Sequence, residues 1–311
     1  VANRYTEIVR NLPYASVGIQ NGIPNGILPA TQTVTSDNTD FRVTYTVRNT
    51  DDPFDGTIGG TPNDTAPADY KQVTVEVSCV SCGGLLQPIR LTTIAAPKNL
   101  ESSSTNGALF IQVLDANGQA VAGASVHVEN TILNPTISLD ETTNVNGLLQ
   151  LVDVPPAIES YHIVVTKNGY STDRTYSPSD SVVVNPIKLD ATVITQQVTQ
   201  ISFAIDRVST LKVSSLSTTC SAVPNVDFSL TGSKLIGTNP DVLKYSQNLS
   251  TDGAGIKLVN NLEWDTYNSL LTDSTYELRG TIPLKPINLA PNSSQELKFI
   301  VQPKTPHSLL V

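Results

Sequence analysis

The sequence has no methionine, few charged residues and no long apolar run. Charged residues make up 15% of the 311 positions, and the formal net charge is −9. Nucleic-acid binders use Lys and Arg to neutralise phosphates, so nucleic acid is not expected as a partner. No stretch reaches the roughly 20 apolar residues that a membrane-spanning helix needs. Because methionine is absent and residues 305–311 read as the start of a further strand or domain, we expect a processed or partial chain.

Cysteine is also scarce. Of the three cysteines, Cys79 and Cys82 are close enough in sequence to form a small disulfide loop, which leaves Cys220 unpaired. A zinc site would need further ligands, and none lie nearby in the sequence. Since disulfides persist in oxidising compartments, the pair favours an exported protein.

Catalytic motifs are missing. The three histidines, His127, His162 and His307, are each solitary, and no nucleophile elbow, His-Glu-x-x-His pair or phosphate loop accompanies them. His127 and His162 occupy alternating positions in apparent strands, which predicts residues on a sheet face. We therefore expect no enzyme.

One amphipathic helix is predicted at the amino end. Val1, Tyr5, Ile8 and Leu12 are spaced by four, three and four residues, which places them on one helix face, with Val9 beside them. Pro13 follows and is expected to end the helix.

The rest of the chain has the pattern of β structure. Residues 39–47 and 72–77 alternate apolar and polar side chains with period two, which predicts strands with one buried face. Asn-Gly turns and short alternating runs then continue from residue 107 to about 304. The fold class is therefore mainly β, with a short amino-terminal helix and a small antiparallel sheet followed by two tandem β-sandwiches.

An internal repeat supports the two sandwiches. Residues 120–128 align with 222–230, 142–152 with 250–259, and 201–205 with 297–301. The same alignment pairs Tyr161 with Tyr276.

A long acidic loop separates the first two predicted strands of the head. The segment between residues 49 and 71 contains three glycines and five aspartates. The aspartates are Asp51, Asp52, Asp55, Asp64 and Asp69. Hard cations such as Ca²⁺ prefer several carboxylate and carbonyl oxygens, so the loop is a candidate calcium site. A solvated cluster of acidic turns is the alternative, because the spacing is not that of an EF-hand.

The single tryptophan gives a second candidate contact. Trp264 and Tyr267 could form an exposed spot that binds a ligand, or they could anchor a core or a domain junction.

Two family resemblances follow from particular motifs. Residues 115–124, the Asn146-Gly147 turn, Pro155-Pro156 and residues 167–170 (Lys-Asn-Gly-Tyr) resemble carboxypeptidase regulatory-like domains. The resemblance implies sandwiches of the transthyretin-like or immunoglobulin-like type, and residues 207–304 share it more loosely.

The opening segment resembles the globular head of a bacterial type IV pilin or pseudopilin. The resemblance rests on residues 10–14 (Arg-Asn-Leu-Pro-Tyr), 52–56 and 64–71. It implies an apolar helix upstream of Val1 that packs in a filament core or anchors the subunit in a membrane. It also implies that the helix face of Val1, Tyr5, Ile8 and Leu12 contacts the filament, and it favours calcium in the loop, because some pseudopilins bind calcium there.

These observations predict a domain plan and a function. Residues 1–98 would form the pilin-like head, 107–206 a first sandwich and 207–304 a second, divergent one. The expected protein is a non-catalytic structural or adhesive subunit of an extracellular filament on a bacterial surface, with copies of itself or other pilins, and an unidentified cell-surface ligand, as partners. The alternatives are a secreted β-sandwich module that binds carbohydrate or protein, and the accessory region of a secreted hydrolase.

Overall fold

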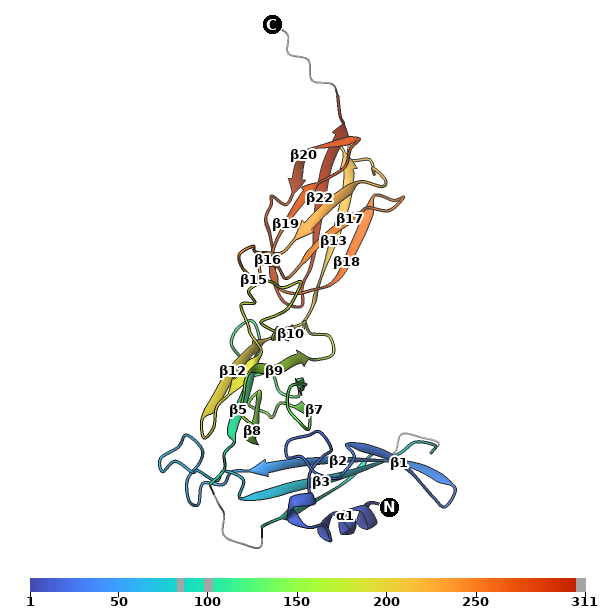
Figure 1. Ribbon diagram of the computed structural model, residues 1–311. Helices are drawn as coiled ribbons and strands as arrows, with labels where there is room; N and C mark the ends of the chain where they lie inside the picture. The colour runs from blue at the N-terminus through green and yellow to red at the C-terminus, as the bar shows by residue number, and fades with distance from the viewer. Residues whose placement is uncertain (83–86, 98–102, 306–311) are drawn as a thin grey trace. The chain divides into compact units, whose positions relative to one another are not determined.

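The computed structural model describes residues 1–82, 87–97 and 103–305. It divides into two compact units, namely Val1–Gln112 with Ser125–Val164 and Asp190–Ser202, and Val113–Ala124 with Val165–Leu189 and Phe203–Val311. Within the described residues, one short α-helix at the amino end is followed by strands (Figure 1). The predicted fold class is confirmed.

The predicted domain boundaries stay a prediction. Residues 98–102 at the first boundary and 306–311 at the carboxyl end lie outside the described residues. None of the described helices is both long and apolar enough to cross a membrane.

The head sheet has four antiparallel strands in the order β1-β2-β3-β4. Their bounds are β1 (Thr31–Ser36), β2 (Thr39–Thr50), β3 (Tyr70–Cys79) and β4 (Ile89–Ala95). The predicted alternation is present, since every second side chain of β2 and β3 is buried on one face: Val43, Tyr45, Val47, Val73, Val75 and Val77. This face and the helix α1 (Ala2–Arg10) form the core of the head.

The helix packs on the sheet through the side of Val9 and Thr6. Val9 is 1% exposed and Thr6 is also buried, whereas Ile8 is 40% and Val1 37% exposed. Val1 and Ile8 of the predicted filament-contact face are thus exposed, whereas Tyr5 and Leu12 of the same face pack against the core of the head. Contact of this face with a filament stays a prediction.

The helix ends before Pro13, as predicted. The chain then forms the 3₁₀ turn η1 (Tyr14–Ser16). Lys71 of β3 is buried beneath this turn, and its Nζ donates to the carbonyl oxygens of Tyr14 (3.1 Å) and Val17 (2.6 Å). The contacts satisfy an ammonium group that burial would otherwise destabilise.

Eight strands form what we call the middle sandwich. Their bounds are β5 (Gly107–Leu114), β6 (Ser125–Asn130), β7 (Ile137–Thr142), β8 (Leu148–Val154), β9 (Ala157–Thr166), β10 (Asp173–Arg174), β11 (Ala191–Val193) and β12 (Val198–Ala204). One sheet has the order β10-β9-β6-β7 with β11 paired to β9, and the other has the order β12-β5-β8.

Ten strands form the third sandwich and its hairpin. Their bounds are β13 (Ser209–Ser217), β14 (Asp227–Thr231), β15 (Leu235–Gly237), β16 (Val242–Leu243), β17 (Ser246–Ser250), β18 (Ile256–Leu262), β19 (Asp265–Leu271), β20 (Tyr276–Ile282), β21 (Ile287–Leu289) and β22 (Ser294–Pro303). The two sheets have the orders β18-β13-β22-β20 and β17-β14-β19-β21, and β15 pairs with β16. Phe228 and Phe299 meet edge to face in the core, with ring centroids 5.2 Å apart.

The internal repeat is visible in the turns. Asn144 Oδ1 accepts backbone N–H bonds from residues two and four positions later, at 2.9 and 3.1 Å. Asp252 Oδ1 does the same at 2.9 Å for both bonds. The sequence alignment pairs these two residues, so the same side-chain-to-backbone turn occurs at the same point in both sandwiches.

The alignment is wrong at Tyr161. Tyr161 in β9 is fully buried, and its hydroxyl donates to Pro155 O (2.5 Å). Tyr267 in β19 is also fully buried and donates to Glu263 O (2.9 Å). Because β9 neighbours β6 as β19 neighbours β14, Tyr267 is the structural counterpart, whereas Tyr276 lies in β20 of the other sheet.

Candidate metal centre

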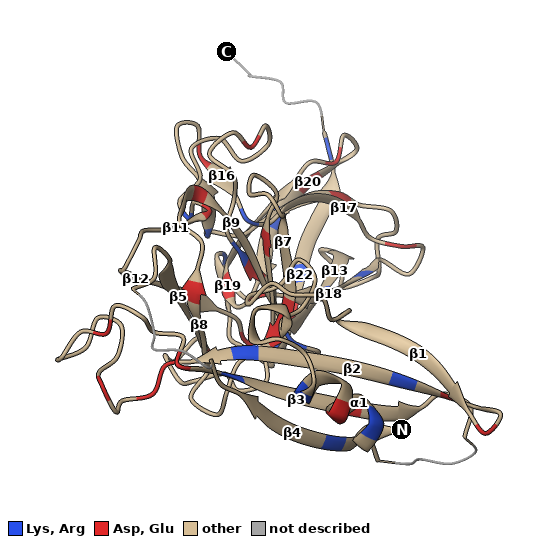
Figure 2. Ribbon diagram, turned by 60° about the horizontal axis from the view of Figure 1, so that its bottom comes forward, with Lys and Arg blue, Asp and Glu red and all other residues tan. Residues whose placement is uncertain are grey.

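The acidic loop, residues 51–69, joins β2 to β3. Acidic segments follow one another along it in Figure 2. Gly56 has a φ of +131°, and a Cβ there would lie 2.5 Å from Pro62 O. The turn that gathers the aspartates therefore requires glycine at this position.

Three of the five predicted aspartates converge directly. Carboxylate oxygens of Asp52, Asp55 and Asp69 all lie within 4.8 Å of one another. Asp69 Oδ2 also accepts the backbone N–H of Asp52 (2.5 Å), and Asp52 Oδ1 accepts that of Phe54 (2.9 Å). These bonds fix the carboxylates from the backbone and leave other oxygen atoms free to bind a cation.

The other two aspartates, Asp51 and Asp64, each have one buried carboxylate oxygen. Asp64 is 7% exposed, and its Oδ1 accepts the backbone N–H of Ala66 (2.7 Å). Asp51 Oδ2 accepts the N–H of Ile58 (3.0 Å). The second oxygens, Asp51 Oδ1 and Asp64 Oδ2, are buried and have no hydrogen-bond partner. Such groups are rare in folded proteins, and an ion that supplies the missing partner is one explanation.

The five charges influence one another. Burial raises the pKa of Asp51 above 3.8, and the negative charges of Asp64, Asp69 and Asp55 raise it further, against the lowering effect of the Ile58 N–H. Burial likewise raises the pKa of Asp69, with Asp55, Asp52 and Asp64 adding to it. A bound cation would relieve this repulsion.

The donor set fits a hard cation. Every side chain of the cluster offers a carboxylate oxygen as a ligand, which is the ligand type that Ca²⁺ prefers, with six to eight oxygens in its shell.

The loop composition was sufficient to find the aspartates in the sequence. It did not indicate Ile58, which is 5% exposed and packs with Ala108 and Val152, because no periodicity marks a single apolar residue in a polar loop.

The other predicted site residues lie elsewhere. Cys79 and Cys82 form the predicted disulfide, with Cα atoms 5.7 Å apart, and Cys220 is free and exposed. Tyr267 is 1% exposed in the core of the third sandwich, which agrees with the alternative of a core anchor and not with an exposed contact. Trp264 is half-buried, with Lys234 Nζ 3.4 Å from its ring centroid.

The histidines pair with aspartates on the sandwich surface. His127 Nδ1 lies 2.8 Å from Asp140 Oδ1, its register partner across β6 and β7. His162 Nδ1 lies 2.9 Å from Asp190 Oδ1. His127 and His162 both lie in strands, β6 and β9, as predicted, and His307 lies outside the described residues.

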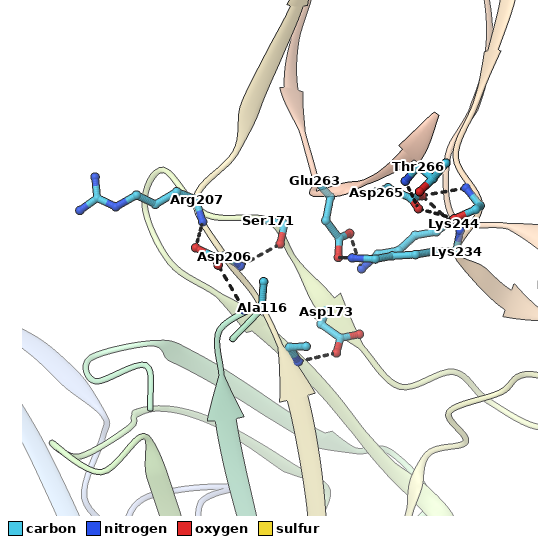
Figure 3. A network of polar contacts seen from close by, with 12 residues as sticks. Ala116, Ser171, Asp173, Asp206, Arg207, Lys234, Lys244, Glu263, Asp265 and Thr266 are labelled. Atoms are coloured by element: carbon cyan, nitrogen blue, oxygen red, sulfur yellow. Dashed lines mark hydrogen bonds and ion pairs between the residues drawn. The ribbon is translucent and has the colours of Figure 1, made fainter. Parts of the chain in front are cut away.

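A second ionic cluster lies in the third sandwich. Figure 3 shows the Glu263 carboxylate between the Lys234 and Lys244 ammonium groups, at 2.7 and 2.6 Å. The neighbouring Asp265 accepts bonds from the N–H and hydroxyl of Ser233 and from two further backbone N–H groups. Both carboxylates have their charge and hydrogen-bond partners within the chain, so we assign this cluster a structural role.

Comparisons with known proteins give distant structural similarity only. No family profile and no curated protein matches the chain. Among solved structures it is similar to the Bacillus anthracis TIE protein, with 13% identity, a TM-score of 0.27, and 88% of this chain and 56% of that chain covered. The chain thus spans just over half the length of that protein.

Two pilins are also similar. The shaft pilin of Lactobacillus rhamnosus GG matches with 12% identity and a TM-score of 0.25, and a minor pilin of Streptococcus agalactiae with 14% and 0.27. Each match covers 65% of this chain and 100% of the pilin. Similarity at this level assigns neither a function nor a partner to the chain.

Proposed function

We propose that the chain is a non-catalytic structural subunit of an extracellular, type IV pilus-like filament on a bacterial surface. The observation that carries the proposal is the exposure of apolar side chains at helix α1. Val9 and Thr6 are buried where α1 packs on the head sheet, while the apolar side chains of Ile8 and of the N-cap residue Val1 remain 40% and 37% exposed. In this proposal these two exposed apolar side chains belong to the surface through which subunits assemble.

The tandem sandwiches fit the same role. Each has its own buried aromatic and aliphatic residues, such as Tyr161 in the middle sandwich and Phe228 in the third. Consecutive small β domains extend a subunit and set its reach. In this proposal they carry the adhesive or spacing function, and the calcium-bound acidic loop orders the head.

Electron microscopy of filaments sheared from the source cells, combined with mass spectrometry of the amino end, tests the proposal. We expect filaments that contain this chain behind an apolar helix. A soluble monomer released by a signal peptidase, with no such helix, would overturn the proposal and favour the secreted binding module.

A matched pair of variants tests the helix surface. Ile8→Glu places a charge on the exposed apolar side chain and should abolish filaments while the full chain stays folded. Glu7→Gln changes a neighbouring exposed residue of the same helix and should leave filaments intact. Normal filaments from Ile8→Glu would show that α1 is not the assembly surface.

A further inference from the structure

Two contacts attach the acidic loop to the middle sandwich. The first is Ile58, which packs in a small apolar cluster with Ala108 of β5 and Val152 of β8. The three side chains are 5%, 0% and 6% exposed, so Ile58 is a plug inserted from the loop. Detaching the loop would expose this side chain to water, so Ile58 is an apolar contact that holds the loop on the sandwich.

The second contact is a backbone hydrogen bond. The N–H of Ser104 donates to Thr65 O of the loop (2.8 Å). The Ser104 hydroxyl in turn donates to Asp153 Oδ1 in β8 (2.6 Å), so Ser104 is itself fixed to the sandwich.

Each contact adjoins an aspartate with an unpartnered oxygen. Asp51 holds the plug directly, since its Oδ2 accepts the N–H of Ile58 (3.0 Å) while its Oδ1 is buried without a partner. Asp64 precedes Thr65, its Oδ1 accepts the N–H of Ala66 (2.7 Å), and its Oδ2 is buried without a partner. Asp64 is 7% exposed, and its negative charge is among those that raise the pKa of Asp51 and Asp69, so it lies near both.

We propose that a hard divalent cation, Ca²⁺, bound through Asp51 and Asp64 together with the outer aspartates, locks the acidic loop onto β5 and β8. The inference rests on the calcium site of the proposed function. Without the cation, the five carboxylates repel one another and the loop detaches readily from the sandwich. With the cation, Asp51 and Asp64 are held, and Ile58 and Thr65 are held with them.

Hydrogen exchange of the full chain with mass spectrometry, in chelator and in calcium, tests the lock. The readout is the amide of Ser104, which is protected only while the loop is attached. If detachment breaks the cation site, its protection rises by the factor 1 + [Ca²⁺]/Kd, or about 100-fold at 100 times Kd. Amides of β13 in the third sandwich should not change.

Calorimetric titration with Ca²⁺ alone separates the two proposals. Failure to bind would overturn the site and the lock together. Binding with unchanged exchange at Ser104 would overturn only the lock.

Substitutions distinguish the residues that bind the cation from the residue that attaches the loop to the sandwich. Asp55→Asn removes an exposed ligand and should lower both affinity and protection, whereas Asp241→Asn removes the same charge outside the cluster and should change neither. Ile58→Ala keeps every carboxylate and should bind calcium while losing most of the protection at Ser104, with Ile58→Val as a milder variant if the first misfolds. Full protection in Ile58→Ala and Ile58→Val would contradict the role of the plug.

Discussion

Asp64 buries a carboxylate oxygen beside four other aspartates, at a position where water would normally solvate it. The main-chain bonds to Asp51, Asp52, Asp64 and Asp69 supply partial positive charge from N–H groups, but no lysine or arginine pairs with the cluster among the described residues. At the residue scale, the loop therefore stores unfavourable electrostatic energy that either protons or a cation can release.

In the presence of chelator, protonation of Asp51 and Asp69 at low pH should remove this unfavourable electrostatic energy. Because the folded-state pKa values of Asp51 and Asp69 are raised above 3.8, ionisation of each group destabilises the folded chain at neutral pH. This penalty disappears as the pH falls through the raised values toward 3.8. We expect Asp51→Asn to melt higher than the wild type at neutral pH in chelator, with the difference shrinking as the pH falls.

Thermal unfolding across that pH range measures the effect. Asp241→Asn serves as the control and should track the wild type. An Asp51→Asn variant that melts lower than the wild type at neutral pH would show that the carboxylate is stabilising without a cation.

Tyr267 supports a second prediction at this scale. Its buried hydroxyl donates to Glu263 O as that of Tyr161 donates to Pro155 O, and burial raises the pKa of both phenols. Tyr267→Phe and Tyr161→Phe should each cost about 1 kcal/mol, because each removes a partly buried hydrogen bond to a backbone carbonyl. Tyr276→Phe should stay within about 0.5 kcal/mol. Urea denaturation measures all three, and equal effects at Tyr276 and Tyr267 would contradict the revised correspondence.

At the scale of elements, the sequence patterns predict where strands lie better than they predict which side of the helix is buried. Alternation placed 39–47 and 72–77 correctly because a two-residue period leaves only two choices of face, and the buried valines of β2 and β3 occupy one of them. The helix allowed both Val1-Tyr5-Ile8-Leu12 and Ala2-Tyr5-Val9-Leu12, since each set has helical spacing. Only packing against the sheet decides that Val9 is buried.

Long-range contacts limited the rest of the prediction. Composition identified the five aspartates of the loop. Neither the unpartnered oxygen of Asp64 nor the insertion of Ile58 beside Val152 leaves a local pattern, because both depend on segments far apart in the chain.

The disulfide at the end of β3 gives a prediction for one element. Cys79 and Cys82 are three positions apart, and closing so short a loop stabilises the folded state by about 2 kcal/mol in the chain-entropy view. Reduction should therefore lower the melting temperature modestly and leave the sheet folded. Intact mass should rise by about 2 Da on reduction, for two added hydrogens, and an unchanged mass would show that the bond is absent.

At the scale of the whole molecule, we expect calcium to matter for one loop of the head and not for the sandwiches. The carboxylate cluster lies in one loop of the head, whereas the third sandwich is held by apolar residues such as Leu211, Phe228 and Phe299. Removing calcium should consequently loosen the loop and spare the sandwiches.

Limited digestion with chymotrypsin tests this contrast. Phe54 is 96% exposed in the loop, and we expect cleavage after it to be faster in chelator than in calcium. Phe54→Ser should abolish that cut and leave the remaining fragments unchanged. Cleavage at Phe54 that proceeds equally in both conditions would count against the cation site.

The pairing of β13 with β22 has a mechanical consequence. These strands run parallel in register from Thr210 with Ser294 to Ser217 with Val301. Tension that enters at the start of β13 and leaves at the end of β22 pulls the two strands past each other along their length. The hydrogen bonds between them then bear the load together in shear, instead of opening one after another like a zip. A domain threaded in this way resists extension, a property that would serve the proposed role in a surface filament when flow pulls on the cell.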